Sequence, residues 1–250
     1  LEIIEFLKNK SVLSVFEDSK KNIWLGTDGD GLHRIDKDFN LESYYHNKNQ
    51  NSISSNVITA INEDPAGNLY FGTFAKGLNI YNPKTKTFKT FSQNYTDQNS
   101  IHSESVWSIL IDSEEKIWLA LLGGGSDIFN PKTESFKNIG PESNELINVG
   151  HHNVMHITED ADGDIWFSTE GKGIYVYDKQ ARKMIRLFPE ETKNITVNGI
   201  IKTIFQKSGI SFHIAKRDDQ LYTIKEIKKG AVDEDFFLEI INTFHDHTYL

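Results

Sequence analysis

The stretch Asp160–Gln180, DADGDIWFSTEGKGIYVYDKQ, contains a pattern that recurs along the chain. In this pattern an Asp is followed six residues later by Trp or Tyr, and seven residues after that by Gly. Four segments keep both offsets, namely Asp18, Trp24 and Gly31; Asp64, Tyr70 and Gly77; Asp112, Trp118 and Gly125; and Asp160, Trp166 and Gly173. The Asp residues lie 46, 48 and 48 residues apart. The chain is therefore a tandem array of one repeated unit.

Within each copy, short apolar blocks alternate with clusters of Gly, Asn, Asp and Pro, which is the pattern of strands joined by tight turns. In the second copy this pattern predicts four strands, at residues 58–62, 68–73, 78–81 and 88–91. Four short antiparallel strands that recur every ~40 to 50 residues indicate the blades of a β-propeller, whose stacking buries faces that no single blade could bury alone. The predicted fold class is all-β, a β-propeller of four-stranded blades.

We expect one domain over residues 1–250. The predicted blades cover approximately residues 12–44, 57–92, 105–140, 153–188 and 200–229, with partial blades at 1–7 and 236–250. The fifth copy has Lys207 in place of the Asp and His213 in place of the Trp. Ile3–Phe6 has the phase of an outer strand, so the chain is expected to open on a strand. Because both ends fall inside repeats, we predict a fragment of a larger propeller rather than a closed five-bladed ring.

Composition argues against several classes of protein. The net charge of −9 and the absence of a basic cluster argue against a nucleic-acid partner. The chain contains no Cys, and therefore no disulfide and no thiolate metal site. No run approaches the roughly 18 to 20 apolar residues of a membrane span. The first residues, LEIIEFLKNK, lack the long apolar segment of a signal peptide.

The repeated residues have structural interpretations. The Asp opens the turn between the first and second strands, where its side chain accepts hydrogen bonds from backbone amides, and a following Gly or Asn suits a left-handed position. The Trp or Tyr is expected to pack between blades. The late Gly is expected to open the third strand after a sharp loop.

Two stretches resemble binding loops but fail their requirements, and neither a metal nor a cofactor is predicted. Asp160, Asp162 and Asp164 alternate as calcium ligands do, but position twelve of such a loop is Gly171 rather than Glu. The stretch GGGSD at 123–127 lacks the Lys and the strand-to-helix context of a phosphate loop. Turns are predicted at both places.

No constellation of catalytic residues stands out, and the chain is expected to be non-catalytic. His151, His152 and His156 lie close together, and a His with an acidic neighbour can act as a general base or bind a metal. We interpret these residues as solvated or loop histidines. A propeller lyase or glycosidase is the alternative.

Variation along the repeats indicates the side on which a ligand binds. In a blade whose strands run outward from the axis, the loops between the second and third strands (the 2–3 loops) open on the same side as the connectors between blades. The 2–3 loops differ between copies, and the connectors hold Tyr44, Tyr45, Tyr95, His102, His151 and His152. Because recognition usually lies on variable loops of a rigid scaffold, we predict the ligand site on this side.

Trp107 is singled out because no other copy has an aromatic residue at its position. The equivalent residues are Leu13, Thr59, Met155 and Lys202. Since packing does not require a ring there, we predict that the indole stacks on a sugar ring; a Trp that fills the local core is the alternative. The complete set of predicted ligand-binding residues is Trp107, Asp30, Lys76, Glu170, Lys172, Arg217, Tyr95 and His152.

The skeleton V-x-x-I-x-E-D-x-x-G-x-I-W-x-G-T-x-x-x-G-L-x-x-Y-x-P-x-T-x-x-F, clearest in the second and fourth copies, resembles the two-component regulator propeller repeat. The connector NSISSN before Val57, echoed by NSIHSES before Val106, is also typical of that family. The third and fifth copies depart from the skeleton. The Trp-Asp dipeptide of WD repeats is absent, and the paired Gly of kelch repeats occurs only in the third copy.

The resemblance implies a hybrid two-component sensor of Bacteroidetes, in which paired seven-bladed periplasmic propellers and a β-sandwich precede a membrane helix and a histidine kinase. It implies that this chain is a periplasmic sensor piece that binds a glycan-derived oligosaccharide and so regulates polysaccharide-utilisation genes. The implied partners are the neighbouring propeller and β-sandwich domains, with a homodimer formed through the parent protein. A propeller that serves as a scaffold for other proteins is the alternative.

Overall fold

The structure, a computed structural model, describes residues 2–48, 50–143, 147–187, 211–217 and 220–227. The chain divides into two compact units, Leu1–Arg186 and Leu187–Leu250. Each unit is described by itself. The expected partial blade at 236–250 lies outside the described residues, as does much of the expected fifth blade. The expectation of one domain over the whole chain stays a prediction.

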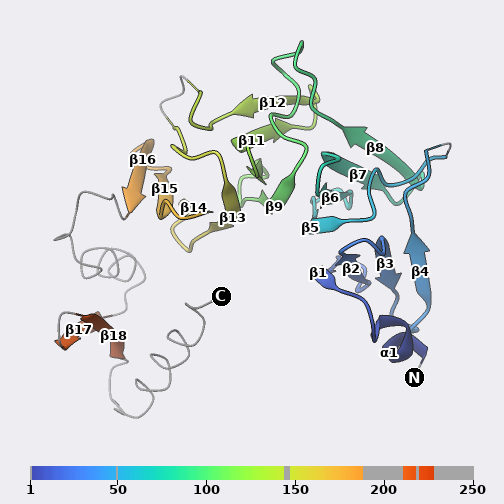
Figure 1. Ribbon diagram of the computed structural model, residues 1–250, viewed down its shortest axis with the longest axis horizontal. Coiled ribbons are helices and arrows are strands. Elements are labelled where there is room, and N and C mark those ends of the chain that lie inside the picture. The colour runs from blue at the N-terminus through green and yellow to red at the C-terminus, as the bar shows by residue number, and fades with distance from the viewer. Residues whose placement is uncertain (1, 49, 144–146, 188–210, 218–219, 228–250) are drawn as a thin grey trace. The chain divides into compact units, whose positions relative to one another are not determined.

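The first unit contains four sheets, each with four antiparallel strands in chain order (Figure 1). Blade 1 consists of β1 (Val12–Glu17), β2 (Ile23–Thr27), β3 (Leu32–Ile35) and β4 (Leu41–Tyr44). Blade 2 consists of β5 (Ile58–Glu63), β6 (Leu69–Thr73), β7 (Leu78–Asn82) and β8 (Thr87–Phe91). The predicted all-β fold with four-stranded blades is confirmed, and the four strands predicted for the second copy are correct to within one residue at each end.

The next two blades repeat this arrangement. Blade 3 consists of β9 (Val106–Ile111), β10 (Ile117–Leu121), β11 (Gly125–Asn130) and β12 (Ser135–Asn138). Blade 4 consists of β13 (Val154–Glu159), β14 (Ile165–Thr169), β15 (Ile174–Asp178) and β16 (Lys183–Leu187). The first strands of successive blades, β1, β5, β9 and β13, contact one another and are called the inner strands below.

The N-terminal segment is a helix, α1 (Glu2–Leu7), and the prediction of an outer strand there is wrong. Ile3, Ile4 and Leu7 have helical spacing, and this segment pairs with no described strand; in a helix its backbone groups bond to one another without a partner strand. The Phe6 ring meets the His33 ring edge-on, with centroids 4.9 Å apart.

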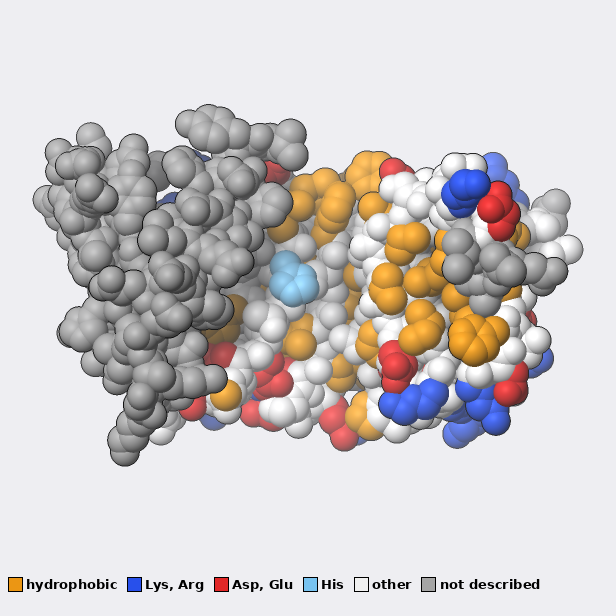
Figure 2. All heavy atoms as spheres, turned by 90° about the horizontal axis from the view of Figure 1, so that it is seen from below, with side chains coloured by type: hydrophobic (Ala, Val, Ile, Leu, Met, Phe, Trp, Pro, Cys, Tyr) orange, Lys and Arg blue, Asp and Glu red, His pale blue; other side chains and the backbone are white. Residues whose placement is uncertain are grey.

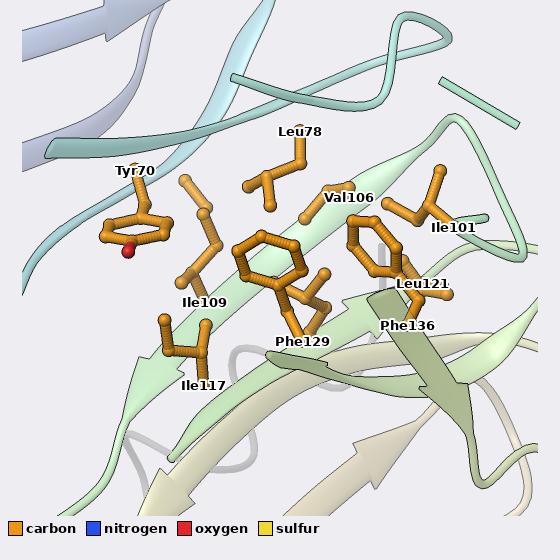
Figure 3. Packing of buried hydrophobic residues seen from close by; sticks show 11 residues of the cluster. Tyr70, Leu78, Ile101, Val106, Ile109, Ile117, Leu121, Phe129 and Phe136 are labelled. Atoms are coloured by element: carbon orange, nitrogen blue, oxygen red, sulfur yellow. The ribbon is translucent and has the colours of Figure 1, made fainter. Parts of the chain in front are cut away.

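Apolar side chains fill the space between neighbouring blades. Trp24 of blade 1 packs on Phe71 and Tyr81 of blade 2, and Trp118 of blade 3 packs on Phe167 of blade 4. The predicted position of these rings between blades is confirmed. Between blades 2 and 3, Tyr70, Leu78, Ile109 and Phe129 belong to one buried cluster, which Figure 3 shows from close by. Tyr44, predicted to lie on the connector, ends β4 and stacks on Trp24.

Polar side chains also join blades. Ser19 of blade 1 donates its backbone N–H and its hydroxyl to Glu63 of blade 2, at 2.6 and 2.8 Å. Ser113 of blade 3 makes the same two bonds to Glu159 of blade 4, at 2.8 and 2.7 Å. Lys179 lies 3.1 Å from Glu159 and therefore adds a cation to this second contact.

The turn glycines occupy positive-φ positions, as predicted. Gly77 has φ +73°, and a Cβ atom there would lie 2.0 Å from the carbonyl oxygen of Phe91. At the third residue after the repeated Asp, φ is also positive, but two of the four residues are Lys21 and Glu115 rather than Gly or Asn. Hydrogen bonding to the Asp therefore imposes this turn even on residues that disfavour it.

The connectors between blades run along the outer strands before they enter the next inner strand. The side chain of Asn51 donates to the carbonyl of Lys86 at 2.8 Å and accepts from the amide of Phe88 at 2.7 Å. In the next blade, the carbonyl of Asn99 accepts from the amide of Phe136 at 2.8 Å. The Asn residues of the two NSI motifs thus hold the first two connectors to the edges of blades 2 and 3.

The described part of the second unit is an antiparallel pair, β17 (Ser211–Arg217) and β18 (Gln220–Ile227). The strand predicted at Leu221–Ile224 lies within β18. None of the helices in the described residues is long and apolar enough to cross a membrane.

Candidate functional site

A hollow of about 440 Å³ lies along the inner strands of blades 1 to 4. It is lined by the second, third and fourth residues of β1, β5 and β9 and by the third residue of β13. Figure 2 shows hydrophobic side chains gathered on a face of the described unit, with a histidine among them. The predicted ligand residue Trp107 and the unpredicted His156 both line this hollow.

A β-bulge at the second residue of each inner strand explains this lining. In β9 the register passes from Val106 directly to Ser108, so that Trp107 is the extra residue without an opposite partner. The same shift occurs at Leu13, Thr59 and Met155. Because a bulge interrupts the alternation of faces, two consecutive side chains can point to the same side. Trp107 and Ser108 therefore both reach the hollow.

The hydroxyl groups on two inner strands are occupied by the neighbouring blade. Ser14 donates to the carbonyl of Ile58 at 3.3 Å, and Thr59 donates to the carbonyl of Val106. These hydroxyls therefore join blades, and their donor hydrogens are not available to a ligand.

His156 is exposed on β13 and is held by Ser108 of the neighbouring blade. The Ser108 hydroxyl lies 3.2 Å from His156 Nδ1 and 3.3 Å from the backbone nitrogen of Ile157. His156 is thus solvent-exposed, as the interpretation as a solvated histidine expects, but it stands on a strand rather than in a loop and lines the hollow. The sequence signal for it was the departure from the small residues Ser14, Ala60 and Ser108 at equivalent positions.

Trp107 is half-buried, and its indole nitrogen is shielded from water without a hydrogen-bond partner among the described residues. His33 Nε2 and Arg34 Nε are the other two side-chain atoms of the described residues in this condition. An unpaired buried donor costs about 1 to 3 kcal/mol, and such atoms call for an explanation. Trp107 is the one of the three that lines the hollow.

The 2–3 loops and the connectors lie on the same side, as predicted. Gly31 donates its amide to the carbonyl of Asn56 at 2.9 Å, and Gly77 donates to Glu104 at 2.7 Å. In blade 3, Gly125 donates to the carbonyl of His152 at 2.7 Å, which confirms a turn in the GGGSD stretch. Each of these loops is thus fixed to the connector that leads into the following blade.

His102, on the connector between blades 2 and 3, contacts the buried carboxylate of Asp127 on β11. His102 Nδ1 lies 3.0 Å from Oδ1 and 3.2 Å from Oδ2 of Asp127, whose side chain is fully buried. Asn138 and the backbone amide of His102 also donate to this carboxylate, at 2.8 and 2.9 Å. The hydrogen bond to Asp127 raises the pKa of His102 against the opposing effect of burial.

The other predicted ligand residues are spread along the 2–3 loops and connectors. Asp30 is paired with Lys10 at 3.1 Å, and the side chain of Glu170 accepts from the side-chain Nδ2 of Asn153 at 2.7 Å. His152 lies 3.8 Å from Glu142. Lys76 and Lys172 are exposed in the 2–3 loops of blades 2 and 4.

Neither of the remaining two residues is placed at the hollow by the structure. Tyr95 is 90% exposed on the connector between blades 2 and 3, and Arg217 ends β17 in the second unit. Of the seven predicted residues in the first unit, Trp107 is the one that lines the hollow. Whether these residues bind a ligand stays a prediction.

The Asp residue that opens a turn accepts hydrogen bonds from backbone amides of the same turn. Oδ1 of Asp160 accepts from the amides of Asp162 and Asp164, each at 3.0 Å. Among the residues that the structure describes, no group of His, Asp and Glu could hold a metal ion.

Comparison with known proteins identifies the repeats. Residues 7–29, 52–75 and 148–171 match the family model of the two component regulator propeller. No curated protein matches the chain significantly. The matched residues fall in the first, second and fourth copies, which agrees with the departure of the third copy from the skeleton.

Solved structures share the fold. An extracellular domain assigned to the hybrid two component system BT3049 from B. thetaiotaomicron aligns with a TM-score of 0.65 at 18% identity, over 89% of this chain and 29% of that domain. The extracellular domain assigned to the one component system BT4673 aligns with a TM-score of 0.62 at 17% identity, over 92% and 33%. Virginiamycin B lyase from Staphylococcus aureus aligns with a TM-score of 0.55 at 14% identity, over 89% and 68%.

The present chain spans about a third or less of the length of the two extracellular domains. At these identities, the similarity shows the fold alone. Identification of the family depends instead on the three matched segments, which contain the repeated Asp and aromatic residues. Three segments of the chain therefore match the two component regulator propeller repeat.

Proposed function

We propose that this chain is the ligand-binding part of a two-component sensor and that it binds an oligosaccharide derived from a glycan. The observation that carries the proposal is the match of three repeats to the two-component regulator propeller. The similarity to extracellular domains of such systems supports a position outside the cytoplasm, on the periplasmic side of the inner membrane. Binding would regulate a histidine kinase and, through it, polysaccharide-utilisation genes.

The proposal assigns no catalysis to this chain. A glycosidase needs a pair of carboxylates at its substrate, whereas no Asp or Glu lines the hollow of the described unit. The fold shared with a lyase is the observation that favours the rival, an enzyme of the propeller class. An enzyme would convert its bound substrate to a product, whereas the proposed sensor binds its ligand without changing it.

In the whole protein we expect the chain to contact neighbouring propeller and β-sandwich domains and to form a homodimer through the parent protein. The alternative is a scaffold that binds other proteins. The strongly exposed ring of Tyr95 on a connector is the observation that favours the scaffold.

The test is thermal unfolding of the chain in the presence of a panel of plant and host oligosaccharides. A ligand that binds the folded state raises the unfolding temperature by mass action. We expect a concentration-dependent rise with at least one sugar and no change in that sugar after prolonged incubation. A sugar that is cleaved would support the enzyme. No shift across the panel, together with capture of a defined partner domain, would support the scaffold.

A further inference from the structure

The hydrogen bonds around His156 indicate that its Nε2–H group is a donor in the hollow. The Ser108 hydroxyl accepts from the amide of Ile157 and lies 3.2 Å from His156 Nδ1. Because Nδ1 is the acceptor that the described residues offer to the hydroxyl hydrogen, we assign that hydrogen to the bond with His156. Neutral His156 then carries its proton on Nε2. No described residue accepts a hydrogen bond from this Nε2–H group, and the side chain is exposed in the hollow.

A second donor belongs to Trp107. Its indole N–H has no acceptor among the described residues, so only apolar packing holds the ring in its orientation. A ligand oxygen that reaches this group would satisfy a donor that the fold leaves unpaired. The indole face also provides the apolar surface against which a flat ring packs.

The described residues that line the hollow carry no fixed charge. None of them is Asp, Glu, Lys or Arg. A charged ligand group would lose its hydration there without a fixed countercharge, which costs far more than the loss of a neutral hydroxyl. The net charge of −9 of the chain further disfavours an anion. The volume of about 440 Å³ lies within the range of small-molecule sites.

From these observations we infer that Trp107 and His156 select an uncharged ring that presents an acceptor oxygen, the chemistry of a neutral sugar. This inference rests on the proposed function and adds the site and the charge class of the ligand. The ring packs on the Trp107 indole, and the acceptor oxygen receives the N–H group of His156, the indole N–H, or both. Ser108 is the positioning residue that fixes the tautomer.

The experiment measures binding of matched sugars to the full chain by isothermal titration calorimetry. The probes are β-1,4-linked tetrasaccharides of glucose, mannose and galactose, each paired with its C6-oxidised form, in which a carboxylate replaces CH₂OH. We expect at least one neutral probe to bind at least about tenfold more tightly than its oxidised form, as rejection of an uncompensated charge predicts.

Variants then locate the site. Trp107→Phe keeps a ring and removes the N–H group, and His156→Leu removes the second donor. Each is expected to weaken the neutral probe about 3- to 10-fold, the equivalent of one hydrogen bond. His156→Gln, which retains an N–H donor, should recover most of the affinity. Met155→Leu is the matched control, because Met155 is the bulge residue of the next inner strand and does not line the hollow.

The outcomes separate the two levels of the proposal. If none of the neutral probes binds the natural chain, this inference is overturned, whereas the proposed function is overturned only if the thermal panel of oligosaccharides also shows no shift. If a probe binds but Trp107→Phe and His156→Leu leave its affinity unchanged, or if the oxidised form binds as tightly, the inference alone is overturned. Trp107→Phe should not lower the unfolding temperature, because it removes an unpaired buried donor; a large loss of stability would identify Trp107 as a core residue instead.

Discussion

The indole Nε1 of Trp118 donates a hydrogen bond to Oδ2 of Asp112, six residues earlier, at 2.9 Å. Oδ1 of the same carboxylate accepts from the amides of Glu114 and Lys116. The same indole bond joins Trp24 to Asp18 at 2.8 Å and Trp166 to Asp160 at 2.7 Å, and the Tyr70 hydroxyl reaches Asp64 at 3.1 Å. One carboxylate thus fixes both a turn and the ring that packs between blades.

Asp112→Ala is expected to lower the free energy of unfolding by about 3 to 5 kcal/mol, because it leaves the buried indole N–H of Trp118 and the turn amides without their acceptor and removes one of the carboxylates that pair with Lys179. Urea denaturation of the purified chain measures the loss. Asp36→Ala is the control, since Asp36 accepts from the amides of Asp38 and Asn40 in the same way but is exposed and bonded to no indole. A loss equal to that of the control would contradict the role given to the indole bond.

Acid should destabilise the fold through these carboxylates. Burial would raise the pKa of Asp18, but hydrogen bonds from Trp24 and Asn22 outweigh it and hold the pKa below its usual value; the pKa of Asp112 is lowered in the same way. Their contribution to stability is therefore complete above the unfolded pKa of about 4 and is lost as the pH falls through the folded pKa. The contribution of these two carboxylates to the urea midpoint should be constant from pH 7 to pH 5. The midpoint should decrease as the pH is lowered further. In Asp112→Asn the fall should be shallower; an equal slope would exclude Asp112 as a source.

His102 has the opposite dependence. Because its pKa is raised in the folded chain, its contribution is fully present below the unfolded pKa of about 6.5 and is lost as the pH rises through the folded pKa. His102→Gln should therefore be less stable than the natural chain at pH 6, and the difference should shrink by pH 9. Thermal unfolding at the two pH values measures this difference. A constant difference would mean that packing rather than the charge on His102 accounts for it.

Gly77→Ala and Gly171→Ala separate a steric clash from backbone strain. The two residues have nearly equal φ angles, +73° and +72°, but the added Cβ meets the Phe91 carbonyl in the first case and nothing within 4 Å in the second. We expect Gly171→Ala to cost roughly 1 kcal/mol and Gly77→Ala roughly 3 kcal/mol or more. Denaturant titrations of both variants make the comparison. Equal losses would show that the loop can move away from the clash.

Trp107→Ala should weaken the binding of the sugar found in the thermal panel by roughly 1 to 3 kcal/mol, the scale of a lost aromatic contact. The fold should remain intact, since the equivalent residues of the other blades are not aromatic. Calorimetric titration gives the affinity, and far-ultraviolet circular dichroism checks the fold. A variant that unfolds early and binds normally where folded would assign Trp107 to the core.

The repeat allowed the strands, the turns and the rings between blades to be predicted, because each copy tests the others. The hydrogen bond between Asp112 and Trp118 was not predicted. The Asp was assigned to a turn and the Trp to packing between blades, and a contact between them was not considered. The fixed offset of six was its signal. The helix α1 was missed because phase alone was extended to a segment that pairs with no described strand.

The candidate site was less accessible to prediction. Trp107 could be found as the exception among equivalent residues, whereas His156 was discounted beside His151 and His152. What brings Trp107 and His156 to the same hollow is the pairing of blades through Ser108 and a β-bulge, and neither follows from the alternation of apolar residues. Tyr44 was assigned both to the end of the first blade, where it lies, and to the connector, because the sequence does not separate the end of β4 from the connector that follows it.

The contact of Asn51 with the outer strand β8 has a consequence for self-association. An outer strand offers unpaired N–H and C=O groups that can add a strand from another molecule, which is a common origin of aggregation. Asn51 occupies the carbonyl of Lys86 and the amide of Phe88 from within the same chain. The connector therefore acts as a built-in cap on the sheet edge, and its loss would expose a template for strand addition between molecules.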